Sequence, residues 1–193
     1  MKVLLIDHED SFVYNLYQAL RVLGTSVDCV RYTEPLARSV RTDPDAIVLS
    51  PGPGHPRDRR VTGHARGLLD RWADERPFLG VCLGHQLIGE YYGGRVGRAE
   101  SPVHGETVEM EHADVPLFRQ VPKRFKAARY HSLVVRRAGL PKHLFVTAAT
   151  RRHTVMGLDH RTLPVHGVQF HPESYLTPDG PRILRNFLTE ARR

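Results

Sequence analysis

Short apolar runs alternate with helical patterns over the first half of this 193-residue chain. Continuous apolar runs are typical of parallel strands that are buried on both faces, and apolar residues at three- and four-residue intervals indicate helices. The sequence predicts strands at 2–7, 27–31, 46–50 and 78–82, and helices at 10–23, at 60–72 and directly after residue 82. Because such alternation implies right-handed crossovers, we expect an α/β fold with a doubly wound, mostly parallel central sheet and flanking helices.

The second half of the chain predicts a small antiparallel extension of this sheet. Short candidate strands stand at 107–110, 130–135, 144–150, 155–159 and 165–170, and an amphipathic helix at 180–191 follows them. We expect the last of these strands to return to the main sheet. Neither a linker nor an internal repeat is visible, so residues 1–193 are expected to form one domain.

The composition narrows the class of protein. The chain has a net charge of +7, is 40% hydrophobic and contains no apolar run of the length that crosses a membrane. Its arginines are spread along the chain, so we expect no nucleic acid and no membrane as partner, and the short arginine clusters suit solvated faces or an acidic protein surface. Two cysteines make no disulfide framework, which favours a cytoplasmic location.

A reactive cysteine is indicated at Cys82. It stands in the heptapeptide G-V-C-L-G-H-Q, between an apolar run and a helical pattern. A strand that turns into a helix at G-x-C-x-G is the cysteine form of a nucleophile elbow, in which the flanking glycines permit a strained turn. The helix N-terminus favours a thiolate there. Cys29 has no such surroundings and is expected to be structural.

A histidine and a glutamate near the end of the chain could serve this thiol. His171 and Glu173 are two residues apart at the end of a predicted strand, so both side chains can point the same way. One can act as a general base and the other can orient it. The chain order Cys, His, Glu is the nucleophile-first order of elbow-type folds.

The surroundings of the thiol also predict groups that bind the substrate. The rigid loop 51–54 follows a predicted strand, and we expect the backbone N–H groups of Gly54 and Leu83 to form an oxyanion hole. Gln86 lies one helical turn after Cys82 on the same side and is expected to hold the substrate.

Four motifs occur in order along the chain: S-P-G-P-G at 50–54, G-V-C-L-G-H-Q at 80–86, Y-H-S-L at 130–133 and G-V-Q-F-H-P-E-S at 167–174. Together they resemble the class I, triad-type glutamine amidotransferases, above all the glutaminase subunits of anthranilate synthase and of aminodeoxychorismate synthase. The resemblance runs from about Val3 to Asn186 without a large insertion.

This resemblance implies an activity, a partner and a set of site residues. Glutamine would be hydrolysed to glutamate by Cys82, His171 and Glu173, and the ammonia would pass to a chorismate-binding synthase subunit in trans, in a heterodimer or heterotetramer. Anthranilate synthase is the favoured assembly. The residues implied in glutamine binding are Gly52, Pro53, Gly54, Gln86, Ser132 and Leu133, of which Ser132 and Leu133 would hold the amino-acid end.

Other functions remain open at this point. Aminodeoxychorismate synthase, GMP synthetase or another ammonia-dependent synthase could be the partner. A γ-glutamyl hydrolase could use the same elbow and histidine, and a non-catalytic regulatory subunit belongs to a different class altogether. The segments 104–105 and 174–177 resemble partner contacts, whereas His8 and Glu106 replace the asparagine and lysine expected at their positions.

A metal site is not expected. Cys82, His85, His171 and Glu173 could all be ligands, but the chain has neither a C-x-x-C pair nor an H-E-x-x-H helix. We expect no metal and no cofactor.

Overall fold

The computed structural model describes residues 1–191, and the side chains among them except those of residues 100–104. The strands are β1 Lys2–Asp7, β2 Ser26–Arg31, β3 Ala46–Leu49, β4 Phe78–Val81, β5 Val96–His112, β6 Arg124–Val135, β7 Leu144–Thr150, β8 Val155–His160 and β9 Val165–Val168. The helices are α1 Val13–Val22, α2 Leu36–Val40, α3 Arg59–Thr62, α4 Ala65–Trp72, α5 Leu83–Tyr91 and α6 Gly180–Glu190, with a 3₁₀ turn at Pro116–Phe118.

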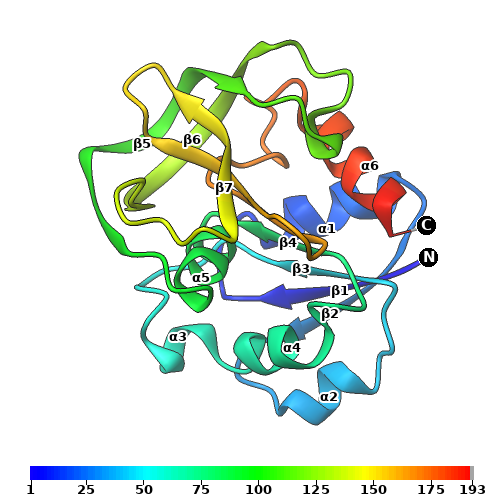
Figure 1. The fold of residues 1–193 in the computed structure, drawn as a ribbon. Coiled ribbons are helices and arrows are strands. Elements are labelled where there is room, and N and C mark those ends of the chain that lie inside the picture. Colours follow the sequence, from blue (N-terminus) through cyan, green and yellow to red (C-terminus); the bar gives the residue numbers. More distant parts are fainter. Residues whose placement is uncertain (192–193) are drawn as a thin grey trace.

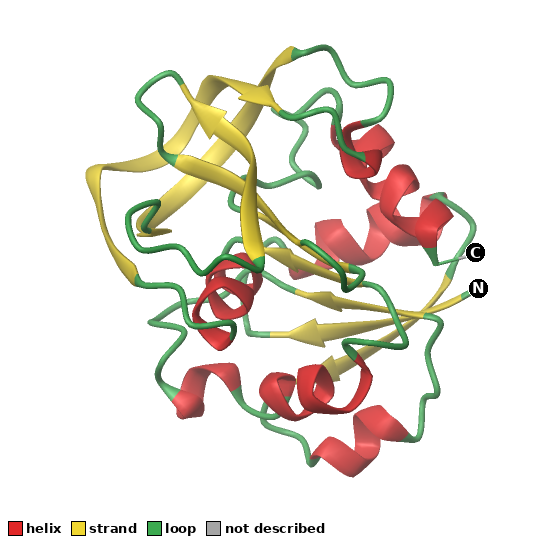
Figure 2. Ribbon diagram, viewed as in Figure 1, coloured by secondary structure: helices red, strands yellow, loops and turns green. Residues whose placement is uncertain are grey.

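Within the described residues these strands form one nine-stranded sheet in the order β2-β1-β3-β4-β9-β8-β7-β5-β6 (Figure 1). The pairings from β2 to β9 are parallel, and those from β9 to β6 are antiparallel. The α/β prediction is therefore confirmed, including the return of the last strand to the main sheet. Figure 2 shows the helices gathered around the parallel strands, while strands and loops make up most of the antiparallel part.

The parallel strands are buried because helices cover both of their faces. Val3 and Leu5 of β1 face α1 and α6, where Leu16 and Phe187 belong to the same apolar cluster. The alternate residues Leu4 and Ile6 face the opposite cluster, which contains residues of α4 and α5. Strand side chains alternate between faces, so a continuous apolar run is what a sheet covered on both sides requires.

The predicted helix 60–72 is wrong in one respect, because two helices occupy it. The chain leaves α3 at Gly63, whose φ is 51°, and α4 begins at Ala65. A Cβ on Gly63 would lie 2.0 Å from the carbonyl oxygen of Tyr32. The break therefore depends on the close approach of a distant segment, which periodicity does not reveal.

Other boundaries also differ from the prediction. Helix α1 begins at Val13 and not at residue 10, because the side chain of Asp10 accepts the N–H of Phe12 in a turn. Helix α2 was not predicted. Strands β5 and β6 are much longer than 107–110 and 130–135, since they pair with each other through segments that carry many charged residues.

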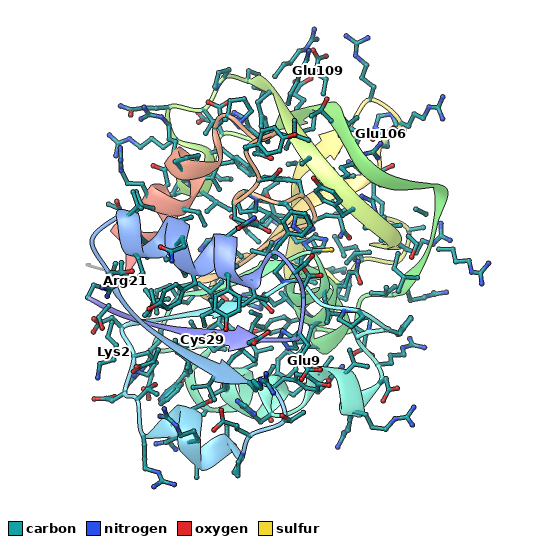
Figure 3. The ribbon with its side chains drawn as sticks, turned by 180° about the vertical axis from the view of Figure 1, so that it is seen from behind. Lys2, Glu9, Arg21, Cys29, Glu106 and Glu109 are labelled. Atoms are coloured by element: carbon teal, nitrogen blue, oxygen red, sulfur yellow. The ribbon has the colours of Figure 1, made fainter. Side chains whose placement is uncertain are left out.

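This topology brings four loops to one edge of the sheet. β1, β3, β4 and β9 are parallel neighbours, so their carboxyl ends point the same way, and ligand sites of open α/β sheets lie at such edges. Figure 3 shows Glu9 beyond the carboxyl end of β1, with Lys2 at the other end of that strand. No helix within residues 1–191 is both long and apolar enough to span a membrane.

Candidate active site

Cys82 occupies a strained turn between β4 and α5. Its φ of 52° and ψ of −98° lie outside the regions that residues with a side chain favour, and such conformations cost about 1–3 kcal/mol and cluster at functional sites. The backbone N–H of Cys82 donates to the carbonyl oxygen of Val168 on β9 at 2.9 Å, which holds the turn against the sheet. A sharp strand-to-helix turn is thus present at the predicted position, and the strained residue is the cysteine itself.

The positions of the two flanking glycines, Gly80 and Gly84, have no room for a side chain. A Cβ on Gly80 would lie 2.4 Å from the carbonyl oxygen of Gly84, and a Cβ on Gly84 would lie 2.3 Å from that of Leu49. Only a hydrogen atom fits at either position. The start of α5 therefore packs directly on the ends of β3 and β4, and its first turn points its unpaired N–H groups toward the region of Cys82.

His171 lies in the loop after β9, because the strand ends at Val168 and not at residue 170 as predicted. The loop is fastened to the edge of β6 that does not face β5. The N–H of His171 donates to the carbonyl oxygen of Ala128 at 3.1 Å. The Thr177 hydroxyl accepts from the N–H of Ala128 at 3.0 Å and donates to the His171 carbonyl at 2.7 Å. A long-range strand edge therefore sets the position of the imidazole.

The structure brings Cys82, His171 and Glu173 together. The Nδ1 atom of His171 lies 2.6 Å from Oε1 of Glu173, and both side chains are buried. Because Nδ1 is taken by Glu173, Nε2 is the ring nitrogen left for the thiol of Cys82, and it has no hydrogen-bond partner among the described residues. Burial alone lowers the pKa of His171, but its interactions with Cys82 and Glu173 and their negative charges raise it to about 10. The ring can therefore hold a proton from the thiol at neutral pH.

Two aromatic rings enclose the imidazole. Phe12, just before α1, and Tyr130, on β6, lie edge-on to His171 with ring centroids at 5.2 and 5.0 Å, and 4.7 Å from each other. Aromatic pairs at these distances favour such edge contacts. The sequence analysis assigned neither residue to the imidazole: Phe12 falls within the predicted helix 10–23, and Tyr130 begins the motif Y-H-S-L.

A cavity of about 320 Å³ reaches Cys82, within the range of roughly 300–1,000 Å³ that small-molecule sites occupy. The residues that line it come from four loops and from β6: Glu9, Asp10, Ser11, Gly52, Pro53, Gly54, Cys82, Gln86, Tyr130, His131, Ser132 and Leu133. All six residues predicted to bind glutamine are in this set. His171 and Glu173 are buried and do not line the cavity.

The loop 51–54 is held beside the start of α5. A Cβ on Gly52 would lie 2.6 Å from Cδ2 of Leu83 and 2.6 Å from Cβ of His8, so the loop, α5 and the end of β1 are in contact. The Ser50 hydroxyl accepts from the N–H of His8 at 2.9 Å and donates to the Pro51 carbonyl at 2.7 Å. Burial, with a smaller contribution from the charge of His64, lowers the pKa of His8 to about 4, so this histidine is neutral at pH 7.

Gln169 is a site residue that sequence reasoning did not identify. It follows β9 directly, is fully buried, and its side-chain nitrogen lies 3.6 Å from the sulfur of Cys82. It belongs to the same motif as His171 and Glu173 and precedes His171 by two residues. The two-residue spacing could have identified Gln169, because the same spacing had led to the pairing of His171 with Glu173.

His85, considered above as a metal ligand, packs against β9: a Cβ on Gly167 would lie 2.7 Å from its Nδ1. It is fully buried on α5, and burial lowers its pKa to about 3, so the ring is neutral. Across the described part of the chain, His, Cys, Asp and Glu side chains form no group of three that could hold a metal ion. Larger hollows of about 400 and 460 Å³ lie on the antiparallel strands, and their described lining contains no cysteine.

The two predicted partner contacts lie near the site. The side chain of His104 is outside the described residues; its backbone pairs with that of Tyr130, which lines the cavity. In the segment 174–177, the ring of Tyr175 is 89% exposed, whereas Ser174 and Thr177 are buried. Tyr175 is thus a large apolar side chain in water, two residues from Glu173.

Comparisons with known proteins find matches over almost the whole chain. The family model described as glutamine amidotransferase class-I matches residues 4–191. The chain is 46% identical over 193 residues to anthranilate synthase component 2 of Methanothermobacter thermautotrophicus, and the match covers 96% of this chain and 97% of that protein. It is also 46% identical over 179 residues to a longer protein of Azospirillum brasilense named anthranilate synthase, of which the match covers 24%.

The fold has a close counterpart among solved structures. A Thermoplasma acidophilum protein described as one of the subunits of GMP synthase superposes with a TM-score of 0.88 at 25% identity, over 100% of this chain and 94% of the other. A glutamine amidotransferase from Thermotoga maritima superposes with a TM-score of 0.74 at 18% identity, over 99% of this chain and 97% of the other.

Proposed function

The chain belongs to the class I glutamine amidotransferase family, and from that premise we propose that it is the glutaminase subunit of an anthranilate synthase. It hydrolyses L-glutamine and supplies the ammonia to a chorismate-binding partner for tryptophan biosynthesis. The observation that carries the proposal is the strained Cys82, which interacts with a His171–Glu173 pair and lines a cavity together with every residue predicted to bind glutamine.

Cys82 supplies the nucleophile. His171 takes the thiol proton, and the sulfur attacks the side-chain carbonyl carbon of glutamine to form a tetrahedral intermediate. His171 returns the proton to the departing nitrogen, so that ammonia leaves and a γ-glutamyl thioester remains. Water then attacks the thioester with His171 as base, which releases glutamate and restores the thiol. Glu173 holds the ring and stabilises the imidazolium.

The oxyanion of the intermediate accepts hydrogen bonds from the backbone N–H groups of Gly54 and Leu83. The contact between Gly52 and Leu83 supports this assignment, because it brings the loop and the start of α5 to one place. Removing one donor of this kind costs about 10²–10³ in turnover.

Gln86 contributes an acceptor to substrate binding. Its Nε2 group already donates to the Leu133 carbonyl at 3.0 Å and to Oε1 of Gln169 at 3.1 Å. An amide nitrogen has two hydrogens, so the side-chain oxygen of Gln86 is the group that remains for the α-ammonium of glutamine. Ser132 and Leu133, which line the same cavity, bind the amino-acid end through main-chain groups.

The synthase partner acts in trans. Relatives near 45% identity carry the name anthranilate synthase component 2, and one longer relative joins a matching segment to further chain under the name anthranilate synthase. The exposed Tyr175 beside the site suits a protein contact. The proposal includes one glutaminase domain at residues 1–193 and a cytoplasmic location, where the free Cys29 and Cys82 stay reduced.

The test reconstitutes the chain with the large subunit of an anthranilate synthase and supplies chorismate with either glutamine or free ammonia. We expect Cys82→Ser to abolish anthranilate formation from glutamine and to leave formation from ammonia intact. Cys29→Ser is the matched control, because Cys29 lies on β2 (Figure 3) and should leave both reactions unchanged. Full glutamine use by Cys82→Ser would refute the nucleophile. Activation only by the large subunit of an aminodeoxychorismate synthase would instead assign the chain to p-aminobenzoate synthesis.

A further inference from the structure

We propose that Gln169 is a further residue of the catalytic machinery, whose side-chain amide donates a hydrogen bond to the sulfur of Cys82. This inference rests on the proposed role of Cys82 as nucleophile. Gln169 and Cys82 are neighbours across the β4–β9 pairing, because Val81 and Val168 are in register and each is followed directly by one of the two residues. The nitrogen of Gln169 lies 3.6 Å from the sulfur.

A chain of hydrogen bonds fixes which end of the Gln169 amide faces the sulfur. A backbone carbonyl only accepts, so the Gln86 atom that lies 3.0 Å from the Leu133 oxygen must be nitrogen. The same nitrogen lies 3.1 Å from the Gln169 side chain, which must therefore present its oxygen there. The NH₂ group of Gln169 is then directed at Cys82. This orientation follows from the network and does not depend on the choice between two similar atoms.

Gln169 is well placed to act on the charged form of the sulfur. It is 0% exposed, and Cys82 is 7% exposed, so little water competes for this contact. A donor stabilises a thiolate more than a thiol, because hydrogen bonds to charged groups are the stronger ones. Two residues of the segment that follows β9 therefore act on the sulfur: Gln169 through its NH₂ group, and His171 through its interaction with the thiol.

The same network links the sulfur to the substrate contact. Gln86 lines the cavity, and its rotamer is tied to Gln169, whose other end is tied to Cys82. One amide therefore orients both the group that attacks and the group that accepts the substrate ammonium. Removal of the Gln169 amide should lower kcat, because the sulfur of Cys82 loses its donor. It should change KM less, because Gln86 keeps its hydrogen bond to the Leu133 carbonyl.

The decisive experiment measures alkylation of Cys82 by iodoacetamide as a function of pH, in the Cys29→Ser background so that one thiol reacts. Gln169→Met removes the hydrogen-bond donor but keeps a side chain of similar volume. Gln169→Glu keeps the shape of the side chain and replaces the NH₂ donor by an oxygen. We expect both to slow alkylation at pH 7 by about 10- to 100-fold and to move the pH profile toward higher pH. Gln18→Glu, on the exposed side of α1, is the control for adding the same charge.

The other titratable residues near the sulfur are the same in all of these variants. They are His171 and Glu173 after β9, Glu9 and Asp10 after β1, and His131 on β6. Ammonia-dependent anthranilate synthesis in the complex reports that the fold and the partner contact are intact, and glutamine hydrolysis gives kcat and KM. Should Gln169→Met fail to fold, the isosteric Gln169→Glu decides alone.

The outcomes separate this inference from the proposed function. If Cys82→Ser loses glutamine hydrolysis while both Gln169 variants keep the wild-type rate and pH profile of alkylation, the role of Gln169 is refuted and the glutaminase stands. If Cys82→Ser keeps hydrolysis, the proposed nucleophile fails, and the role of Gln169 fails with it. Slower alkylation with a shifted profile and a lower kcat supports the assignment.

Discussion

The elbow depends on the absence of a side chain at Gly84, and Gly84→Ala tests this. A Cβ at this position would lie 2.3 Å from the Leu49 carbonyl oxygen and 2.8 Å from the Leu49 carbonyl carbon. To reach ordinary contact, α5 or β3 must move by about 1 Å. Overpacking of this kind costs about 1–3 kcal/mol, and the backbone neighbours favour the upper end because they cannot rotate away.

The substitution also brings a gain, which has to be subtracted. Alanine is better than glycine inside a helix by about 1 kcal/mol. The net destabilisation is therefore about 2 kcal/mol, and for a chain of this size each kcal/mol lowers Tm by about 2–4 °C. The same displacement moves Cys82 and the N–H of Leu83, and an error of about 1 Å at a reacting group can cost about 10²-fold in rate.

Gly67→Ala in α4 provides the matched control. Its Cβ would meet the side-chain end of Leu36 at 2.9 Å, and that end can turn aside. We expect Gly67→Ala to have an unchanged or slightly raised Tm and full glutamine-dependent synthesis. Thermal unfolding followed by circular dichroism and anthranilate formation from glutamine measure the two effects. Equal Tm values and equal activities for the two variants would show that the reasoning about Gly84 is wrong.

Two further predictions concern buried pairs of a histidine with a carboxylate. Burial lowers the pKa of His166, but the carboxylates of Asp159 and Glu190, which lie 3.0 and 2.8 Å from its two ring nitrogens, raise it to about 10. Because the pKa in the folded state exceeds the unfolded value of 6.5, the protonated His166 stabilises the fold fully below pH 6.5, and this stabilisation is lost as the pH rises toward 10. Between these pH values the free energy of unfolding of the wild type should fall, relative to that of His166→Gln, by up to about 1.4 kcal/mol per pH unit. An equal pH dependence of the two unfolding free energies, measured by denaturation, would contradict this prediction. Glu173→Gln should slow glutamine hydrolysis by about 10²- to 10⁴-fold without affecting ammonia-dependent synthesis, and wild-type hydrolysis by this variant would remove Glu173 from the mechanism.

Much of the site could be predicted from the sequence because neighbouring residues in the chain determine it. A turn such as G-V-C-L-G needs glycines at fixed offsets from the central residue, so Cys82 was identifiable from its neighbours alone. Apolar runs that lack alternation mark strands buried on both faces, so the parallel half of the sheet was predicted with nearly correct boundaries. The resemblance in four motifs added Ser132 and Leu133, which local pattern alone does not single out.

Only the tertiary structure decided the rest, because it depends on contacts between segments far apart in the chain. The break at Gly63 is set by the Tyr32 carbonyl, and the place of His171 by the edge of β6 at Ala128. The amide of Gln169 meets the sulfur of Cys82 across 87 residues of chain. Such contacts follow from strand register and from which side chains have room, and neither is expressed in the order of residues around any one position.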